Sequence, residues 1–540
     1  MEDFAKLRIE YKPKIPKILE NIRSLTFKES DKFPKTDSEI TKYTPNISKK
    51  PFLELFDSDN TSSPLKVGVV FSGGQAPGGH NVITGIFDAI KTFHPESKLF
   101  GFLNGPGGIV KGEYKELTAS IVDVYRNQGG FDMIGSGRTK IETDEQFHKS
   151  AKTVKELNLD GLIIIGGDDS NTNAALLAEY FIKKNIYTSV IGVPKTIDGD
   201  LKNEYIEISF GFDTATKVFS EIIGNLARDA LSARKYYFFV KLMGRTASHI
   251  ALECALKTHP NYTLISEEVA AKNMTLHNIV EEIALMIQKR AEQDKNYGII
   301  LIPEGLIEFI PDVSILIQEL NDLLANSSPS EEGCIANKLS KNSADCYNLL
   351  PTEIQKQLIL DRDPHGNVQV SKIETESLLI NLVEKKLSKQ KSNGLYKGSF
   401  NSQSFFCGYE GRCSFPSNFD AHYCYALGQT ASLLVKSKVT GYIACIKNLI
   451  KHVSDWTITG IPLSSMLKME KRKNKFTPVI EKALVDLQSD SFKFFNCRRE
   501  EWKFSDDFQY PGPMQLYGPE NITDSTPMTM QNALFQTLKK

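Results

Sequence analysis

The segment PKTIDGD (residues 194–200) holds the side chains with the clearest catalytic potential in this sequence. Asp198 and Asp200 are separated by one residue, and they follow Lys195 and Thr196 directly. A positioned carboxylate can take the proton from an attacking hydroxyl group, and a nearby ammonium group stabilises the negative charge that spreads over phosphate oxygens. This combination suits phosphoryl transfer, although an acidic surface loop with a solvated lysine has the same composition.

A second acidic turn, IIGGDDSN (residues 164–171), places Asp168 and Asp169 side by side behind two glycines. An aspartate on a glycine turn can hold Mg²⁺, directly or through water, against phosphate oxygens. Asp168 is therefore the candidate metal ligand. Because adjacent like charges repel, the second carboxylate requires an explanation of its own.

A glycine-rich turn, FSGGQAPGGHN (residues 71–81), contains Gly73 and Gly74 and leads into a helix-length stretch. Glycines let backbone N–H groups approach a phosphate closely, and the start of a helix favours negative charge. No lysine follows the glycines, so the turn is not a Walker A loop. A purely structural turn would give the same pattern.

Two arginines and one glutamate complete the candidate set. Arg245 lies in LMGRTASH and Arg412 in GYEGR, and the planar guanidinium group suits phosphate oxygens. Glu304 ends the apolar run IILIPEG and could accept hydrogen bonds from sugar hydroxyl groups. Residue types and spacing together indicate a magnesium-dependent phosphotransferase that acts on a small phosphorylated acceptor.

The elements that must position these turns follow one pattern. A short apolar run ends in a glycine-rich or acidic turn, and a helix-length stretch comes next. Such strands and helices predict an α/β fold with doubly wound, mainly parallel sheets, in which ligands bind beyond the carboxyl ends of the strands. The pattern occurs at residues 65–74, 159–171, 188–200, 235–245 and 296–305.

The composition sets limits on the function. The chain is 41% hydrophobic, with a mean hydropathy of −0.27 and a formal net charge of −1, which is typical of a soluble globular protein. We find no basic stripe interleaved with aromatic residues, so we expect no nucleic-acid partner. The first twenty residues are charged and contain prolines, so we expect no signal peptide, no membrane segment and a cytosolic location.

The eight cysteines show no disulfide framework, and the group Cys407, Cys413, His422 and Cys424 fits no standard zinc spacing.

The motifs together resemble the phosphofructokinase family, in particular its long pyrophosphate-dependent branch. Across residues 66 to about 470 the chain shows, in the order of the family, SGGQAPGGHN, GFLNGPGGI, GSGRTK, GGDDS, PKTIDGD, FGFDTA, ARKYYFFVKLMGR, PEG and YEGR. The resemblance implies the phosphofructokinase fold, with two Rossmann-like lobes. We expect an amino-terminal arm at 1–65, a diphosphate-binding lobe at 66–208 and about 418–500, a fructose 6-phosphate lobe at 209–417 with a helical insertion at about 308–400, and a carboxyl-terminal strap at 501–540.

The resemblance also implies a role for each matching residue. Asp198 is the base that accepts the proton of the sugar 1-hydroxyl, and Asp168 serves Mg²⁺. Lys235 and Tyr236 are presented to the sugar site of a neighbouring subunit, which implies a homodimer or a larger homo-oligomer. The remaining catalytic residues are Thr196, Asp200 and Arg245; the donor-binding residues are Gly73, Gly74, Arg138, Asp169 and Lys195; the sugar-binding residues are Thr196, Ile197, Asp198, Met243, Gly244, Arg245, Glu304, Tyr409, Glu410, Gly411 and Arg412.

The phosphoryl donor is implied by two positions. ATP-using relatives carry glycine where this chain has Asp169, and glycine again where it has Lys195. A carboxylate about 4 Å from the α-phosphate of a nucleotide costs about 4 kcal/mol at an effective dielectric constant near 20, which is roughly a thousandfold in binding. Asp169 would thus exclude ATP, Lys195 would hold a diphosphate that has no nucleoside, and Mg²⁺ would screen Asp168 from its neighbour.

The implied reaction converts diphosphate and D-fructose 6-phosphate into orthophosphate and D-fructose 1,6-bisphosphate, reversibly, as a step of glycolysis. Three alternatives remain at this point. An ATP-dependent phosphofructokinase would lack the two donor residues, and a non-catalytic regulatory subunit would have lost some of the catalytic set. A kinase of the lipid or dinucleotide type can share a GGD turn but lacks PKTIDGD and MGR.

Overall fold

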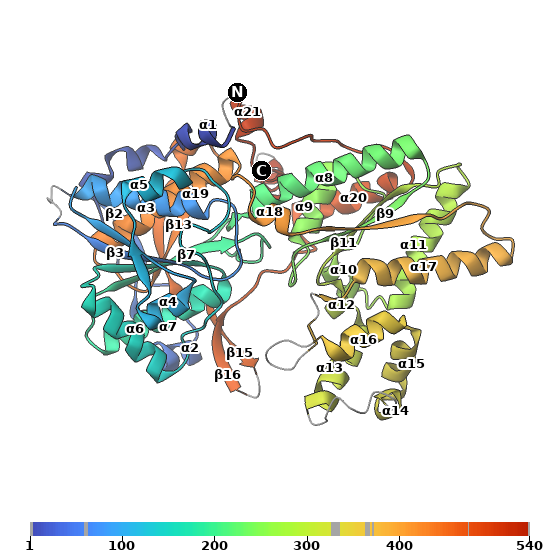
Figure 1. The fold of residues 1–540 in the computed structure, drawn as a ribbon, viewed down its shortest axis with the longest axis horizontal. Coiled ribbons are helices and arrows are strands. Elements are labelled where there is room, and N and C mark those ends of the chain that lie inside the picture. The colour runs from blue at the N-terminus through green and yellow to red at the C-terminus, as the bar shows by residue number, and fades with distance from the viewer. Residues whose placement is uncertain are drawn as a thin grey trace. The chain divides into compact units, whose positions relative to one another are not determined.

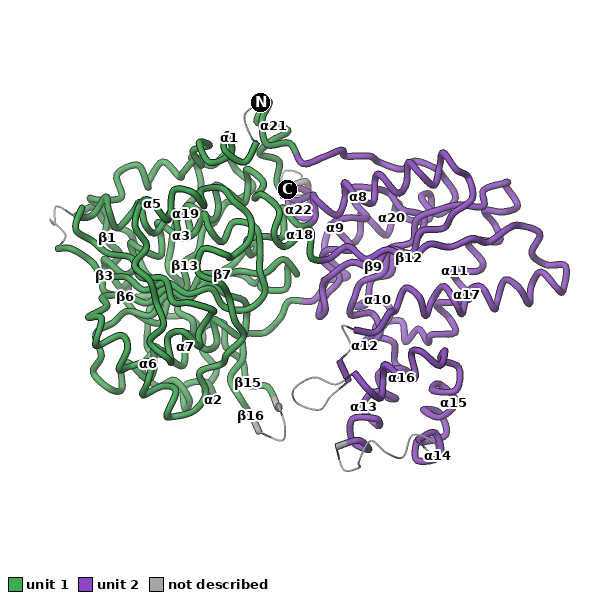
Figure 2. The backbone as a smooth tube through the Cα atoms, viewed as in Figure 1, with its two compact units in different colours: residues 1–215, 409–483, 515–526 green, residues 216–408, 484–514, 527–540 purple. Residues whose placement is uncertain are grey.

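The computed structural model describes residues 4–58, 63–325, 335–361, 368–369, 372–472 and 475–537. The chain forms two compact units, each assembled from separate stretches of sequence (Figure 2). Unit 1 comprises residues 1–215, 409–483 and 515–526, and unit 2 comprises residues 216–408, 484–514 and 527–540.

Unit 1 is built on an eight-stranded sheet in the order β14-β13-β7-β6-β3-β4-β5, with β8 paired to β7. All neighbouring strands run parallel except the outermost pairs, β13 with β14 and β4 with β5. The strands are β3 (Lys66–Phe71), β4 (Lys98–Phe102), β5 (Tyr114–Glu116), β6 (Gly161–Gly166), β7 (Ser189–Thr196), β8 (Phe210–Gly211), β13 (Tyr442–Lys447) and β14 (Thr457–Pro462).

Helices cover both faces of this sheet, as Figure 1 shows. Helices α3 (Gly79–Phe93) and α19 (Asn418–Lys436) pack together on one face, and α4 (Pro106–Lys111), α6 (Asp144–Glu156) and α7 (Asp168–Lys183) lie on the other. Because both faces are covered, a central strand such as β6 is apolar and buried along its whole length. The α/β class predicted from the sequence is confirmed.

The rest of unit 1 lies around this core. The short helices are α1 (Phe4–Glu10), α2 (Ser38–Tyr43), α5 (Ala119–Val122), α18 (Tyr409–Arg412) and α21 (Glu520–Thr523), with 3₁₀ turns at Lys17–Ser24, Ile47–Lys49, Asp123–Tyr125, Val453–Asp455 and Leu463–Met466. Two antiparallel ribbons pair β1 (Leu25–Glu29) with β2 (Leu53–Asp57), and β15 (Leu467–Arg472) with β16 (Lys475–Ile480). The amino-terminal arm is attached through His422, whose Nδ1 accepts a hydrogen bond of 3.0 Å from the backbone N–H of Lys14.

Unit 2 contains a parallel four-stranded sheet in the order β10-β11-β9-β12. The strands are β9 (Tyr237–Leu242), β10 (Tyr262–Thr263), β11 (Gly298–Pro303) and β12 (Ser402–Cys407). The helices are α8 (Phe212–Ala233), α9 (His249–Thr258), α10 (Ser266–Ala271), α11 (Leu276–Ala291), α12 (Leu306–Phe309), α13 (Pro311–Ala325), α14 (Ile335–Lys338), α15 (Lys341–Leu349), α16 (Thr352–Leu360), α17 (Thr375–Ser392), α20 (Asp490–Phe504) and α22 (Met528–Thr537).

The core of unit 2 explains the helical stretch that precedes β12. On α11, Ile279, Ile283 and Ile287 recur every four residues and form one apolar face, which is fully buried. Leu316 and Leu320 on α13 and Leu379 on α17 belong to the same hydrophobic cluster. Helices α13 to α17, which lie within the stretch that the sequence assigns to an insertion, therefore share one core with the sheet of unit 2.

Three further observations concern the described part of the chain. None of its helices combines the length and the apolar character needed to cross a membrane. Its seven cysteines are all free thiols. Within the same residues, no group of three or more His, Cys, Asp or Glu side chains is arranged to hold a metal ion.

Candidate active site

Three of the predicted turns lie at one edge of the sheet in unit 1. Strands β3, β6 and β7 are adjacent and parallel, and their register pairs Phe71 with Ile165 and Gly166 with Pro194. The turn after each strand therefore begins at nearly the same height. The glycine turn, the Asp168–Asp169 turn and the Lys195–Asp200 segment are brought together in this way, although each comes from a different part of the sequence.

Lys195 connects two of these turns. Its Nζ donates a hydrogen bond of 2.7 Å to the carbonyl oxygen of Gly74. The side chain is 5% exposed, and burial lowers the pKa of Lys195 to about 8. The positive charge of Arg412 also lowers this pKa, whereas the carboxylate of Asp198 raises it. The ammonium group is thus held in a dry position next to the glycine turn, where an anion can gain from it.

The backbone of the glycine turn depends on the absence of side chains. Gly73 has φ +88°, and a Cβ atom at this position would lie 3.3 Å from Nζ of Lys195. A Cβ atom at Gly74 would lie 3.2 Å from Nη1 of Arg412. The turn is also tied to Gly137, whose carbonyl oxygen accepts a hydrogen bond of 2.9 Å from Gly73 N. Arg138, the next residue, is exposed beside this turn.

Arg412 brings the segment 409–412 to the same place within unit 1. Its guanidinium group lies against Gly74, and its Nε is buried without a hydrogen-bond partner among the described residues. An unpartnered buried donor costs free energy unless a ligand accepts its hydrogen bond. Tyr409 is exposed and Gly411 is buried, and both belong with Glu410 to α18.

One carboxylate from each of the two acidic turns, Asp168 and Asp200, faces Lys482. Nζ of Lys482 lies 3.7 Å from Oδ2 of Asp168 and 3.9 Å from Oδ2 of Asp200, so both carboxylates face the same cation. Burial raises the pKa of Asp168, and the ammonium group of Lys482 opposes this shift. The sequence pattern did not identify Lys482.

Asp169 has a partner of its own. Its Oδ1 accepts a hydrogen bond of 3.2 Å from Nζ of Lys140, and the two side chains are 50% and 44% exposed. Lys140 belongs to the GSGRTK motif, but the motif alone assigns it no role. The carboxylate that we expect to exclude ATP is therefore partly neutralised in this structure.

The base candidate follows the end of β7. Asp198 is partly exposed, and its backbone N–H donates a hydrogen bond of 3.1 Å to Oγ1 of Thr196. Ile197 between them is buried, and Gly199 has φ +74°. The two carboxylates of this tight turn lie in different surroundings. Asp198 is partly exposed, whereas Asp200 is 4% exposed and faces Lys482.

Unit 2 holds a second group of predicted residues where β9 and β11 end. Glu304 is 6% exposed, and its Oε2 accepts a hydrogen bond of 2.9 Å from the backbone N–H of Gly244. Gly244 has φ +132°, which places it in the region that favours glycine. Met243 is buried and Arg245 is exposed, so the same turn carries one apolar and one cationic side chain.

Lys235 and Tyr236 are not brought to that group. They precede β9, whereas Met243 to Arg245 follow it, so the two sets lie at opposite ends of one strand. Nζ of Lys235 lies 4.9 Å from the centre of the Tyr236 ring, and Lys235 is exposed.

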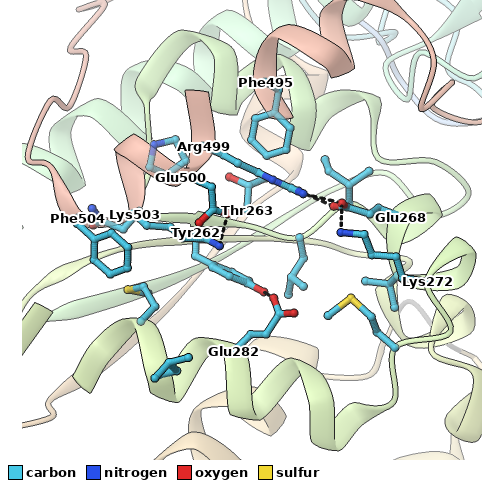
Figure 3. A pocket seen from close by; sticks show the side chains of 18 of the residues that line it. Tyr262, Thr263, Glu268, Lys272, Glu282, Phe495, Arg499, Glu500, Lys503 and Phe504 are labelled. Carbon is cyan, nitrogen blue, oxygen red and sulfur yellow. Dashed lines mark hydrogen bonds and ion pairs between the residues drawn. The ribbon is translucent and has the colours of Figure 1, made fainter. Parts of the chain in front are cut away.

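A cavity of about 350 Å³ lies elsewhere in unit 2, between β10, α10, α11 and α20 (Figure 3). None of the predicted site residues lines it. Several of its polar groups pair with one another: Arg499 forms two hydrogen bonds of 2.6 Å with Glu268, and the hydroxyl group of Tyr262 donates one of 2.6 Å to Glu282.

Comparisons with known proteins agree with this architecture. The profile of the family described as "Phosphofructokinase" matches residues 66–435. The chain is 55% identical over 476 residues to the pyrophosphate–fructose 6-phosphate 1-phosphotransferase of Treponema pallidum, covering 86% of this chain and 83% of that protein. It is 56% identical over 485 residues to the subunit beta 2 of the enzyme of that name from Arabidopsis thaliana, covering 89% and 85%.

Among solved structures, the pyrophosphate-dependent phosphofructokinase of Nitrosospira multiformis superimposes with a TM-score of 0.55 at 14% identity, covering 86% of this chain and 96% of that one. At this level of identity the likeness concerns the fold, and it confirms the predicted phosphofructokinase fold. Together with the match over residues 66–435 and the identities above 50%, it establishes that the chain belongs to the phosphofructokinase family.

Proposed function

We propose that the chain is an enzyme that transfers a phosphoryl group from diphosphate to the 1-hydroxyl of D-fructose 6-phosphate, reversibly and with Mg²⁺, as a step of glycolysis. The observation that carries the proposal is the buried ammonium group of Lys195 on the glycine turn. It supplies a fixed positive charge for a donor that has no nucleoside to hold it. The names of the relatives from Treponema pallidum and Arabidopsis thaliana support the same donor and acceptor.

The donor is assigned to unit 1. Gly73 and Gly74 form the turn at the end of β3, Lys195 supplies the buried charge, and Arg138 is exposed beside the same turn. Asp169 excludes the α-phosphate of a nucleotide by repulsion, and its pairing with Lys140 weakens this repulsion without removing it.

A metal ion fits the carboxylate pair in unit 1. Asp168 and Asp200 face one cationic position, and oxygen atoms of one or two carboxylates together with substrate phosphates are the ligands that Mg²⁺ usually has in such enzymes. We therefore assign Asp168 as the ligand and Asp200 as its neighbour. The ion, when bound, would neutralise charge on the phosphate oxygens during transfer.

Asp198 is assigned as the base. Its carboxylate accepts the proton of the 1-hydroxyl while the hydroxyl oxygen attacks the nearer phosphorus of diphosphate, and orthophosphate leaves. Thr196 and Ile197 shape this turn, because the Thr196 hydroxyl accepts the Asp198 N–H. The family resemblance assigns Arg245, which lies in unit 2, to the transferring phosphoryl group or the substrate.

The acceptor is assigned to the ends of β9 and β11 in unit 2. Glu304 accepts hydrogen bonds from sugar hydroxyl groups, and its orientation is fixed by the Gly244 N–H. Met243 and Arg245 belong to the same turn as Gly244. The family resemblance also assigns Tyr409 to Arg412 to the sugar phosphate. Lys235 and Tyr236 lie at the other end of β9, which supports the proposal that they serve a second copy of the chain in a homodimer or larger homo-oligomer.

The free thiols support a cytosolic location.

A coupled assay of the purified chain with fructose 6-phosphate and Mg²⁺ tests the proposal, with diphosphate or ATP supplied in parallel. Formation of the bisphosphate with diphosphate alone is the expected result. Turnover with ATP alone would replace the donor assignment by that of an ATP-dependent phosphofructokinase. Inactivity with both donors would favour a non-catalytic subunit. The Arabidopsis thaliana relative is itself named as a subunit, so this alternative is worth testing.

A further inference from the structure

Lys482 occupies a position in unit 1 that neither the motifs nor the relatives assign. Its Nζ lies 3.7 Å from Asp168 and 3.9 Å from Asp200. Both distances exceed that of an N–H···O hydrogen bond but lie within the range of an ion pair, so the ammonium group faces both carboxylates at once. The Lys482 side chain is 29% exposed, whereas those of Asp168 and Asp200 are 19% and 5% exposed, so the cation approaches the pair from its solvent side.

The backbone around Lys482 is fixed to helix α7 and to the turn after β7. Ile480 N, two residues before it, donates a hydrogen bond of 3.0 Å to Oγ1 of Thr172 on α7. Ala483 N, the next residue, donates one of 2.7 Å to the carbonyl oxygen of Asp200. These two contacts hold the chain on both sides of Lys482 and keep its side chain next to the carboxylates of Asp168 and Asp200.

The charges around Lys482 give the side chain two possible counterions. Without a metal ion, the carboxylates of Asp168 and Asp200 have a net charge of −2, and Lys482 offsets part of their repulsion. A divalent cation at the same carboxylates would repel the ammonium group. A diphosphate that enters with the cation would bring several negative oxygen atoms, and it would attract the same group.

We infer that Lys482 is a donor-binding residue, which stabilises the Asp168–Asp200 pair in the empty enzyme and pairs with the diphosphate oxygens when the metal ion and the donor bind. The inference rests on the proposed function and adds one positioned cation to it. Lys195 supplies a buried charge next to the glycine turn, whereas Lys482 supplies a partly exposed one opposite the carboxylates.

The first test measures diphosphate binding by calorimetry, with Mg²⁺ present and fructose 6-phosphate absent, so that no turnover occurs. Lys482→Met keeps the aliphatic stem and removes the charge. We expect its dissociation constant for diphosphate to rise roughly tenfold to a hundredfold, as for the loss of one charged hydrogen bond. Lys482→Arg should stay within a few fold of wild type. Lys468→Met is the matched control, because Lys468 lies on the adjoining ribbon and pairs with Glu481.

The second test measures the metal ion alone, with Mn²⁺ as the probe and no diphosphate. Removing the ammonium group should tighten Mn²⁺ binding severalfold, because the cation no longer competes with it for the carboxylates. Opposite effects on the metal ion and on diphosphate are not expected from damage to the fold, which would weaken both. Unchanged or weaker Mn²⁺ binding in a folded Lys482→Met variant would overturn the inference.

The outcomes separate the inference from the proposed function. If the wild-type chain binds no diphosphate, the proposed function fails. If the wild type binds diphosphate and Lys482→Met binds it as tightly, only the role of Lys482 fails. Thermal unfolding of each variant accompanies the titrations; should Lys482→Met not fold, Lys482→Gln replaces it with the same expected results and the same overturning ones.

Discussion

Nζ of Lys195 donates a hydrogen bond of 2.7 Å to the carbonyl oxygen of Gly74, and this contact ties the end of β7 to the turn after β3. A lysine that is 5% exposed is costly to keep charged unless an anion or several dipoles face it. The contact therefore indicates where a phosphate group gains most from unit 1, and it leads to the first prediction.

Diphosphate binding should weaken at alkaline pH. The folded-state pKa of Lys195 is about 8, lowered from 10.5 by burial, so the side chain is charged below pH 8 and loses its charge as the pH rises through that value. The apparent KM for diphosphate should rise between pH 7.5 and 9, since bound diphosphate requires the charged form. Lys195→Arg, which stays charged, should flatten this profile, and an identical profile in the variant would contradict the assignment.

Asp198→Asn should abolish proton transfer while leaving binding largely intact. Loss of a general base lowers kcat by roughly 10²–10⁴-fold, and the KM values should change only a few fold. Steady-state assays in both directions measure this, because Asp198 returns the proton in the reverse reaction. A rate within tenfold of wild type would remove Asp198 from the role of base.

Asp169→Gly should admit ATP, and Asp169→Gly with Lys195→Gly should admit it further. The structure adds a reason, because the loss of Asp169 leaves Nζ of Lys140 without its carboxylate partner and able to attract nucleotide phosphates. We expect ATP to bind at least tenfold more tightly to the double variant. Adding Lys140→Met should reverse part of this gain. If neither variant binds or uses ATP, electrostatic exclusion at this position is wrong.

Gly73→Ala should impair diphosphate binding more than a comparable change elsewhere. Gly73 has φ +88° and would place a Cβ atom 3.3 Å from Nζ of Lys195. Gly394→Ala is the matched control, because Gly394 has φ +73° but no atom within 4 Å of a new Cβ. Both variants should lose about 1–2 kcal/mol of stability from the backbone conformation, whereas only Gly73→Ala should raise the KM for diphosphate. Equal KM effects would show that the turn does not contact the donor.

Much of the candidate site can be predicted from the sequence, because parallel strands place their carboxyl ends at one edge. Gly73, Asp168 and Asp198 could be grouped on this ground alone, since each comes after an apolar run. The roles of these residues in catalysis stay predictions. The side-chain partners could not be predicted in the same way. Lys482 comes after an antiparallel ribbon about three hundred residues beyond Asp168, and no local pattern around it indicates a ligand.

The amino-terminal arm shows the same limit. No function can be inferred from its residues alone, but the structure connects Lys14 to His422 through the backbone and to Asp524 through a hydrogen bond of 2.8 Å. These contacts join residues separated by four to five hundred positions. Such pairings depend on the path of the whole chain, so periodicity within a short window contains no information about them.

The discontinuous composition of both units has a consequence for biosynthesis. Unit 1 includes residues 515–526 and unit 2 includes residues 527–540. In unit 1, Asp524 accepts hydrogen bonds from Lys14 and Asn418. A domain made from one continuous stretch can fold while the ribosome is still translating the next segment of the chain. Here neither unit contains all of its stretches until translation has passed residue 526, so the growing polypeptide exposes incomplete cores for most of its synthesis.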